Sequence, residues 1–139
     1  MQRKKQKGFT LVELMLVVVI IGVLATVAVL KFTGRAQDAR ITSAKAKISG
    51  QYGTALQLYE IDCGKYPSTE EGLAALRSSS AKGWKGPYIK DSNFNDPWGN
   101  AYQYRCPGTN NPDDFDLYSF GPDGQEGGGD DITNWDSGD

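Results

Sequence analysis

The stretch FGPDGQEGGGDDITNW, near the end of the sequence, could bind a cation. It carries four carboxylates within nine residues, namely Asp123, Glu126, Asp130 and Asp131. A loop so rich in glycine cannot hold its shape by packing, and repulsion between the carboxylates opposes its closure. A hard divalent cation would reverse that repulsion, since calcium takes about six to eight oxygen ligands. The spacing is not that of an EF-hand, so composition leaves two interpretations open: a solvated acidic loop or a calcium site.

Another carboxylate, Glu13, stands at the start of an otherwise apolar segment. Leu14 to Leu30 is a run of 17 residues without a charge, and as a helix it would be about 25 Å long, near the lower limit for crossing a bilayer. A carboxylate in hydrocarbon is costly and usually has a partner. The segment therefore predicts a membrane anchor in which Glu13 needs an explanation.

The basic residues that precede the apolar segment favour two simple interpretations, a cleaved secretory signal peptide or a retained signal anchor. The segment ends AVLKFTGRAQ, which offers no small-x-small cleavage site. Four basic residues in the first seven positions predict that the N-terminus is cytoplasmic: Arg3, Lys4, Lys5 and Lys7. Neither interpretation accounts for Glu13.

Composition argues against catalysis and against nucleic acid as a partner. The chain has no histidine, the commonest general base, and no P-loop or G-x-S-x-G motif. Adjacent carboxylates such as Asp130 and Asp131 rarely face one target in a flexible loop. Without the first eight residues, 11 basic side chains stand against 17 acidic ones, whereas phosphate binding needs clustered cations. We therefore expect neither an enzyme nor a nucleic-acid-binding protein.

The chain has two cysteines, Cys63 and Cys106. Two cysteines cannot form a structural zinc site by themselves. They would form a disulfide if the domain lies outside the cytoplasm, or remain buried thiols otherwise. Both outcomes stay open at this level.

Hydrophobic periodicity predicts an α+β domain behind the apolar segment. Apolar residues recur at helical spacing from Ile41 to Tyr59, so we expect one long helix over residues 10–61, ended by Gly64 and Pro67. Ser68 and Glu71 form a capping-box pattern that predicts a short helix over 69–77. The alternating segments AYQYR and FDLYSF predict strands, and the turn DPWG precedes the first of them.

The segment KGFTLVELMLVVVIIGVLA resembles the class III signal of type IV pilins and pseudopilins. The resemblance implies that a prepilin peptidase removes residues 1–8 by cutting between Gly8 and Phe9, and that it methylates the new amino terminus of Phe9. Residues 9–33 would then serve as transmembrane helix and later as fibre core. Glu13 would pair with that amine, within one subunit or on its neighbour, during assembly. Many members carry a proline near the end of this helix, and here none occurs before Pro67.

The segments YEIDCGKYPSTEEGLAAL, DPWGNAYQY and DLYSFGPDGQEGGGDDITNW resemble the major pseudopilin family of type II secretion systems, general secretion pathway protein G. The resemblance implies a type IV pilin-like fold: a long helix packed on a small antiparallel sheet, with a periplasmic domain over 34–139 that ends in an acidic loop over 120–135. It further implies a homopolymer, the periplasmic pseudopilus, that drives export of folded proteins across the outer membrane. The implied partners are minor pseudopilins, the assembly platform of the bacterial inner membrane, prepilin peptidase and, before assembly, membrane lipid.

The alternative within the same superfamily is a type IV pilin of a surface fibre for adhesion or motility. Such pilins usually carry a longer domain closed by a C-terminal disulfide loop. Cys63 and Cys106 fall elsewhere in this chain, a placement that fits a pseudopilin with a bridge of its own.

The resemblance also implies a structural Ca²⁺ in the last loop. Its ligands would be the side chains of Asp123 and Asp130 and the backbone carbonyls of Phe120 and Gln125. The remaining side-chain ligand falls on Gly128, which has no side chain, so its carbonyl, a water or Asp131 would substitute. We expect the ion to fold the loop, and Glu126 to be a solvated side chain.

Overall fold

The computed structural model describes residues 8–135, apart from the side chains of residues 30–33. The chain divides into two compact units, with the boundary between Ala36 and Gln37. Most of the predicted leader, residues 1–7, lies outside the described residues.

The first unit is the apolar helix. Helix α1 spans Leu11–Lys45, so its N-terminal part makes up this unit. The large apolar side chains from Phe9 to Val29 are 49% to 84% exposed, although such side chains are normally buried in a folded chain. Among the described residues one helix is long and apolar enough to cross a membrane, with a mean hydropathy of 2.8 over its most apolar window. The predicted anchor is thus present as a helix whose described apolar side chains are exposed.

The predicted long helix is present, but it is not α-helical throughout. After α1 come a π-helical turn, η1 (Ala46–Tyr52), and helix α2 (Gly53–Cys63). The backbone N–H of Gly53 donates to the carbonyls of Ile48 and Gly50, and a Cβ at Gly53 would lie 3.0 Å from the Ile48 oxygen. Glycine therefore fits the wide turn. The helix ends as predicted at Gly64, which has a positive φ of 79°.

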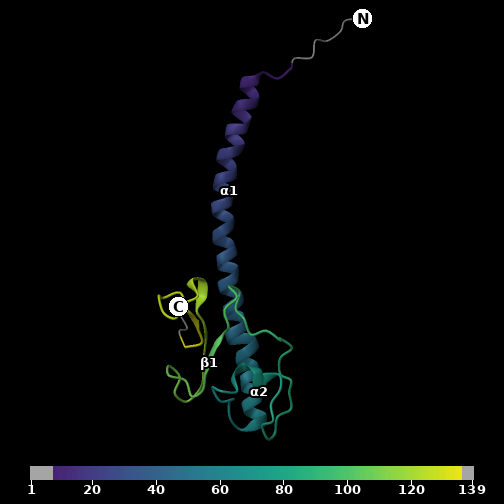
Figure 1. The fold of residues 1–139 in the computed structure, drawn as a ribbon, viewed down its shortest axis with the longest axis vertical. Coiled ribbons are helices and arrows are strands. Elements are labelled where there is room, and N and C mark those ends of the chain that lie inside the picture. The colour runs from purple at the N-terminus through teal and green to yellow at the C-terminus, as the bar shows by residue number, and fades with distance from the viewer. Residues whose placement is uncertain (1–7, 136–139) are drawn as a thin grey trace, which may run out of the picture. The chain divides into compact units, whose positions relative to one another are not determined.

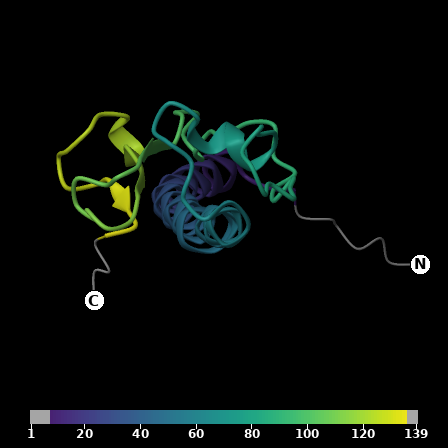
Figure 2. The same ribbon diagram turned by 90° about the horizontal axis from the view of Figure 1, so that it is seen from below.

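The core lies along one face of the second unit's helix. The predicted apolar stripe is buried from Ala44 to Tyr59, and it packs against Leu73, Leu76, Ile89, Tyr102, Phe115 and Leu117. Figure 2, seen from below, shows the segment that follows α2 (teal to green) and the C-terminal segment (yellow) on different sides of the helix. The aromatic residues of the predicted strands thus belong to a small core.

The short helix predicted over 69–77 is present as a shorter 3-10 helix, η2 (Gly72–Leu76). Its capping box forms as predicted: the Ser68 N–H donates to Glu71 Oε2 at 2.8 Å, and the Glu71 N–H donates to Ser68 Oγ at 3.2 Å. Leu73 and Leu76 are buried as expected. A single tight turn is enough to bury these two leucines.

The sheet has three short antiparallel strands in the order β1-β2-β3: β1 (Gln103–Arg105), β2 (Asp116–Ser119) and β3 (Ile132–Thr133). Gln103 pairs with Tyr118, and Tyr118 pairs with Thr133 on its other side. Figure 1 shows β1 (green) alongside the helical stalk of the second unit, near the yellow C-terminal segment. Strand β3 was not predicted, because two residues next to a glycine run carry too little alternation to indicate a strand.

Candidate functional site

Glu13 caps the helix on which it lies. Its Oε2 accepts hydrogen bonds from the Thr10 backbone N–H at 2.8 Å and the Thr10 hydroxyl at 3.2 Å. In return, the Glu13 N–H donates to Thr10 Oγ1 at 3.2 Å. This reciprocal pair is a capping box, which satisfies backbone donors that a helix start leaves free. The pattern T-x-x-E is visible in the sequence, and the sequence analysis missed it.

The cap gives Glu13 a local role beside the predicted pairing with the amine of Phe9. Phe9 is 84% exposed, and in this chain its backbone nitrogen is part of the peptide bond with Gly8. The structure therefore contains no free amine at Phe9 with which Glu13 could pair. The assembly role of Glu13 stays a prediction.

The acidic loop brings together three of the predicted calcium positions. The Asp123 backbone N–H donates to Asp130 Oδ2 at 3.2 Å, although seven positions separate the two residues. A Cβ at Gly128 would lie 3.2 Å from Asp130 Oδ1 and 3.3 Å from Asp123 Oδ2. Both carboxylates therefore lie close to the position that a side chain on residue 128 would occupy.

The backbone of the loop favours glycine at this point. Gly128 has a φ of +83°, in the left-handed region that residues with a side chain rarely adopt. The carbonyls of Phe120 and Gln125 flank the 3-10 turn η3 (Gly121–Asp123), and the Gln125 N–H donates to Asp123 Oδ1 at 2.8 Å. The loop is thus closed on itself through Asp123.

Asp131 supplies a further oxygen. Its Oδ2 accepts from the Gly127 N–H at 2.8 Å, whereas its Oδ1 is buried and has no hydrogen-bond partner among the described residues. A buried carboxylate oxygen without a partner is unfavourable unless a cation or a water meets it. The donor set of carboxylates and carbonyls fits a hard cation such as Ca²⁺. Within residues 8–135, no three His, Cys, Asp or Glu side chains form a metal-binding group, so the calcium site stays a prediction.

Glu126 is exposed, as expected for a solvated side chain, and its Oε1 also accepts a hydrogen bond from the Tyr118 hydroxyl at 2.8 Å. Burial, and then this hydrogen bond to a carboxylate, raise the pKa of Tyr118 to about 12. Glu126 therefore ties the acidic loop to strand β2.

Cys63 and Cys106 are free thiols in the structure, and both are half-buried against the core. Burial raises the pKa of Cys106. The disulfide between them stays a prediction.

A buried carboxylate that the sequence analysis did not single out, Asp96, organises the DPWG turn. Its Oδ1 accepts from the backbone N–H groups of Trp98 at 3.0 Å and Asn100 at 2.9 Å. Its Oδ2 accepts from the Ser119 hydroxyl at 2.6 Å. Asp96 thus joins the turn to strand β2. The signal was present, because aspartate before a proline turn commonly bonds the backbone two residues on.

Comparisons with known proteins agree with this architecture. Residues 31–135 match the family described as type II secretion system (T2SS), protein G, and residues 3–29 match the prokaryotic N-terminal methylation motif. The type II secretion system core protein G of Pseudomonas aeruginosa is 48% identical, over 99% of this chain and all of that protein. The core protein G of Aeromonas hydrophila is 38% identical, over 97% of this chain and 96% of that protein.

A solved structure shares the fold. The crystal structure of the major pseudopilin from the type 2 secretion system of enterohaemorrhagic Escherichia coli superposes with a TM-score of 0.64 at 31% identity, covering 76% of this chain and 91% of that one. The predicted fold class, a long N-terminal helix on a small antiparallel sheet, is confirmed. The chain belongs to the type II secretion system protein G family, a family of structural pseudopilins rather than of enzymes.

Proposed function

We propose that this chain is a subunit that polymerises into the periplasmic pseudopilus of a type II secretion system and so drives export of folded proteins across the outer membrane. The observation that carries the proposal is the apolar helix of the first unit, whose large side chains are 49% to 75% exposed, whereas the second unit has its own buried core. Removing each such side chain from water stabilises the buried state by about 1.5–3 kcal/mol. Lipid first, and sister helices later, would supply that burial.

The first residues of the chain would direct processing. Prepilin peptidase would cut between Gly8 and Phe9 and methylate Phe9, in agreement with the methylation motif over residues 3–29. The N-terminus would face the cytoplasm and the folded domain the periplasm. Minor pseudopilins and the inner-membrane assembly platform would be the further partners. The subunit itself would have no catalytic activity.

Glu13 would act twice in this scheme. In the uncut chain it caps the helix through Thr10. After cleavage it would pair with the amine of Phe9, because each charge is costly alone in an apolar medium and much less so when paired. That pairing would favour one axial register between neighbouring subunits.

The acidic loop would hold a structural Ca²⁺. Asp123 and Asp130, with the carbonyls of Phe120 and Gln125, would bind it, and Asp131 or the Gly128 carbonyl would replace the side chain that Gly128 lacks. The ion would neutralise the carboxylates of Asp123 and Asp130, which both lie close to Gly128. Its binding free energy would add to the stability of the folded loop.

Mass spectrometry of the protein extracted from membranes tests the proposal. We expect a chain that begins with N-methylated Phe9 and keeps the apolar segment, and the full-length chain in cells that lack prepilin peptidase. A protein that keeps residues 1–8 in normal cells, or that loses the apolar segment, would contradict it. Electron microscopy at native expression separates a periplasmic fibre from a long surface fibre, which would indicate a type IV pilin instead.

A further inference from the structure

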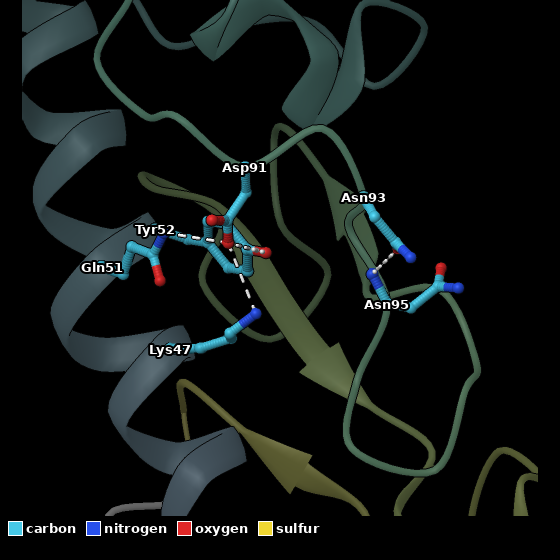
Figure 3. Close-up of polar contacts among 6 residues, drawn as sticks. All are labelled: Lys47, Gln51, Tyr52, Asp91, Asn93 and Asn95. Atoms are coloured by element: carbon cyan, nitrogen blue, oxygen red, sulfur yellow. Dashed lines mark hydrogen bonds and ion pairs between the residues drawn. The ribbon is translucent and has the colours of Figure 1, made fainter.

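A hollow of about 610 Å³ lies between the stalk helix and the loop of residues 90–99. Its walls are polar and include Lys47, Lys90, Asp91, Asn93, Asn95 and Asp96. Figure 3 shows Lys47, Gln51 and Tyr52 reaching from the stalk toward Asp91, with Asn93 and Asn95 on the loop beyond. None of these side chains has a part in the anchor or in the acidic loop.

Asp91 joins the loop to the stalk. Its Oδ2 accepts from Lys47 Nζ at 3.3 Å, from Gln51 Nε2 at 3.0 Å and from the Tyr52 hydroxyl at 3.5 Å. The charge of Lys47 is thereby balanced. Asp96, on the opposite wall, is buried, and its carboxylate already accepts from Trp98, Asn100 and Ser119. Neither carboxylate of the hollow is left to balance another cation.

Two further cations lie beside this balanced pair. Lys90 is exposed, and it forms no ion pair within the described residues. Arg40, seven positions before Lys47, lies on the same flank of the helix about two turns away, and it too is exposed without an ion pair in the described part of the chain. The loop runs along the stalk as far as this turn, because Trp98 Nε1 donates to Gln37 Oε1 at 3.3 Å. We call Arg40 and Lys90, the two cations without an ion pair, the cationic flank.

The opposite charge is concentrated elsewhere in the same domain. From Asp113 to Asp139 the sequence has nine acidic residues and no lysine or arginine. Across residues 8–135, the carboxylates of the acidic loop form no salt bridge, since the two ion pairs there are Lys47–Asp91 and Lys85–Asp62. Glu126 is exposed on this loop, held in place by Tyr118 and outside the proposed calcium ligands.

Charge favours a contact between unlike surfaces of two copies. Two acidic loops repel when they meet face to face, whereas an acidic loop against a cationic flank is complementary. A contact between two different surfaces of identical subunits is heterologous, and a heterologous contact that does not close into a ring builds a helical filament. The charge distribution of this domain therefore fits a fibre better than a symmetric dimer.

We propose that the cationic flank of one copy binds the acidic loop, residues 123–131, of a second copy in the fibre, with Lys90 facing Glu126. This inference rests on the proposed polymerisation and adds the surfaces through which the folded domains meet. The attraction steers one copy to the next and penalises wrong registers, and it weakens as salt concentration rises.

Charge reversal in the full-length chain tests the pairing. We expect Lys90→Glu to lower the amount of sedimentable fibre by about tenfold, since like charges across an interface repel. Glu126→Lys should lower it similarly, and the two changes together should restore most of it. Lys82→Glu is the matched control, because Lys82 is exposed and has no ion pair within residues 8–135. Equal losses for Lys82→Glu and Lys90→Glu, or no recovery in the double variant, would overturn the pairing.

A cross-link locates the contact directly and does not depend on charge reversal. A photoreactive amino acid replaces Lys90 in copies that carry light isotopes, and these assemble with heavy-isotope copies of the natural sequence. Because Arg105 is the last basic residue, trypsin releases residues 106–139 as one peptide. We expect a cross-link from the light position 90 to the heavy 106–139 peptide. Fibres that cross-link elsewhere would refute this contact and leave polymerisation standing, whereas absence of any fibre in the natural sequence would refute polymerisation.

Discussion

Asn110 donates two hydrogen bonds to one oxygen of the buried carboxylate of Asp116, through its backbone N–H at 2.9 Å and its side-chain amide at 3.0 Å. Backbone N–H groups of Thr109 and Asn111 add two more, at 2.7 Å and 2.9 Å. Asp116 is 1% exposed. One carboxylate therefore holds the whole turn before strand β2.

The stability of the domain should fall in acid because of Asp116. Burial by itself would raise the pKa of Asp116, but the hydrogen bonds from Asn110, Asn111 and Thr109 outweigh it and lower the pKa. Because the pKa of Asp116 is lower in the folded protein than its unfolded value of about 3.9, the ionised carboxylate stabilises the fold above that pH. This stabilisation is lost as the pH falls through the folded-state pKa. We expect Asp116→Asn to lower the free energy of unfolding at pH 7 by about 2 kcal/mol and to flatten its decline below about pH 4, as measured by urea unfolding in detergent.

Asp113→Asn is the control for this prediction. Asp113 is exposed and lies in the same turn, so its replacement should change stability by less than about 0.5 kcal/mol. An acid dependence that is the same in both variants would show that another group is responsible.

The two roles of Glu13 can be separated by its amide. Glutamine can replace glutamate in a capping box but carries no charge. We expect Glu13→Gln to leave membrane insertion and the helix start intact while fibre assembly is lost, as measured by sedimentation and electron microscopy. Normal fibres from Glu13→Gln would show that the carboxylate serves as a cap alone. Thr10→Ala removes the cap partner and is the converse control.

Two tyrosines near the sheet should respond oppositely to loss of their hydroxyl. The Tyr104 hydroxyl donates to the Pro67 carbonyl at 2.8 Å, whereas the Tyr102 hydroxyl is buried without a partner in the described residues. We expect Tyr104→Phe to cost about 1 kcal/mol and Tyr102→Phe to be neutral or stabilising. Thermal unfolding of both variants checks this, and an equal loss in both would contradict it.

Removal of calcium should destabilise the acidic loop. We expect EGTA to lower the melting temperature and Ca²⁺ to restore it, because an ion bound to the folded state alone stabilises that state. Asp130→Asn should abolish the response, and Glu126→Gln, which changes a carboxylate outside the proposed ligands, should keep it. A melting temperature insensitive to EGTA would count against the ion.

The state of the cysteines can be read by thiol titration of the denatured, unreduced protein. If Cys63 and Cys106 pair in the periplasm, no free thiol is found. If they stay free, as in the structure, two thiols react after denaturation. In the folded protein at pH 7, Cys106 should then react slowly, because burial raises its pKa and lowers the fraction of thiolate.

The sequence predicts those parts of the fold whose signal is local and repeated. The apolar stripe from Ala44 to Tyr59, the helix end at Gly64 and the cap between Ser68 and Glu71 are each encoded within a few residues. The structure confirms all three. The N-terminal cap of Thr10 and Glu13 is encoded equally locally, by the pattern T-x-x-E, although it was not predicted.

The parts that escaped prediction depend on contacts between distant segments. Strand β3 exists because Ile132 and Thr133 pair with strand β2, and two residues have no periodicity of their own. The carboxylate of Asp91 meets Lys47 and Gln51 across about forty positions, and no spacing rule covers such a distance. For the acidic loop, composition left both a solvated loop and a calcium site open, and the resemblance to a family selected the ligands.

The π-helical turn at Ala46–Tyr52 bears on which changes of chain length the stalk tolerates. A π turn corresponds to one residue inserted into an ordinary helix. This surplus residue makes the turn tolerant of a one-residue deletion, since the shorter chain can close into a regular α-helix. Length variation among relatives would then be expected in this turn, inside a helix, and not in the loops alone.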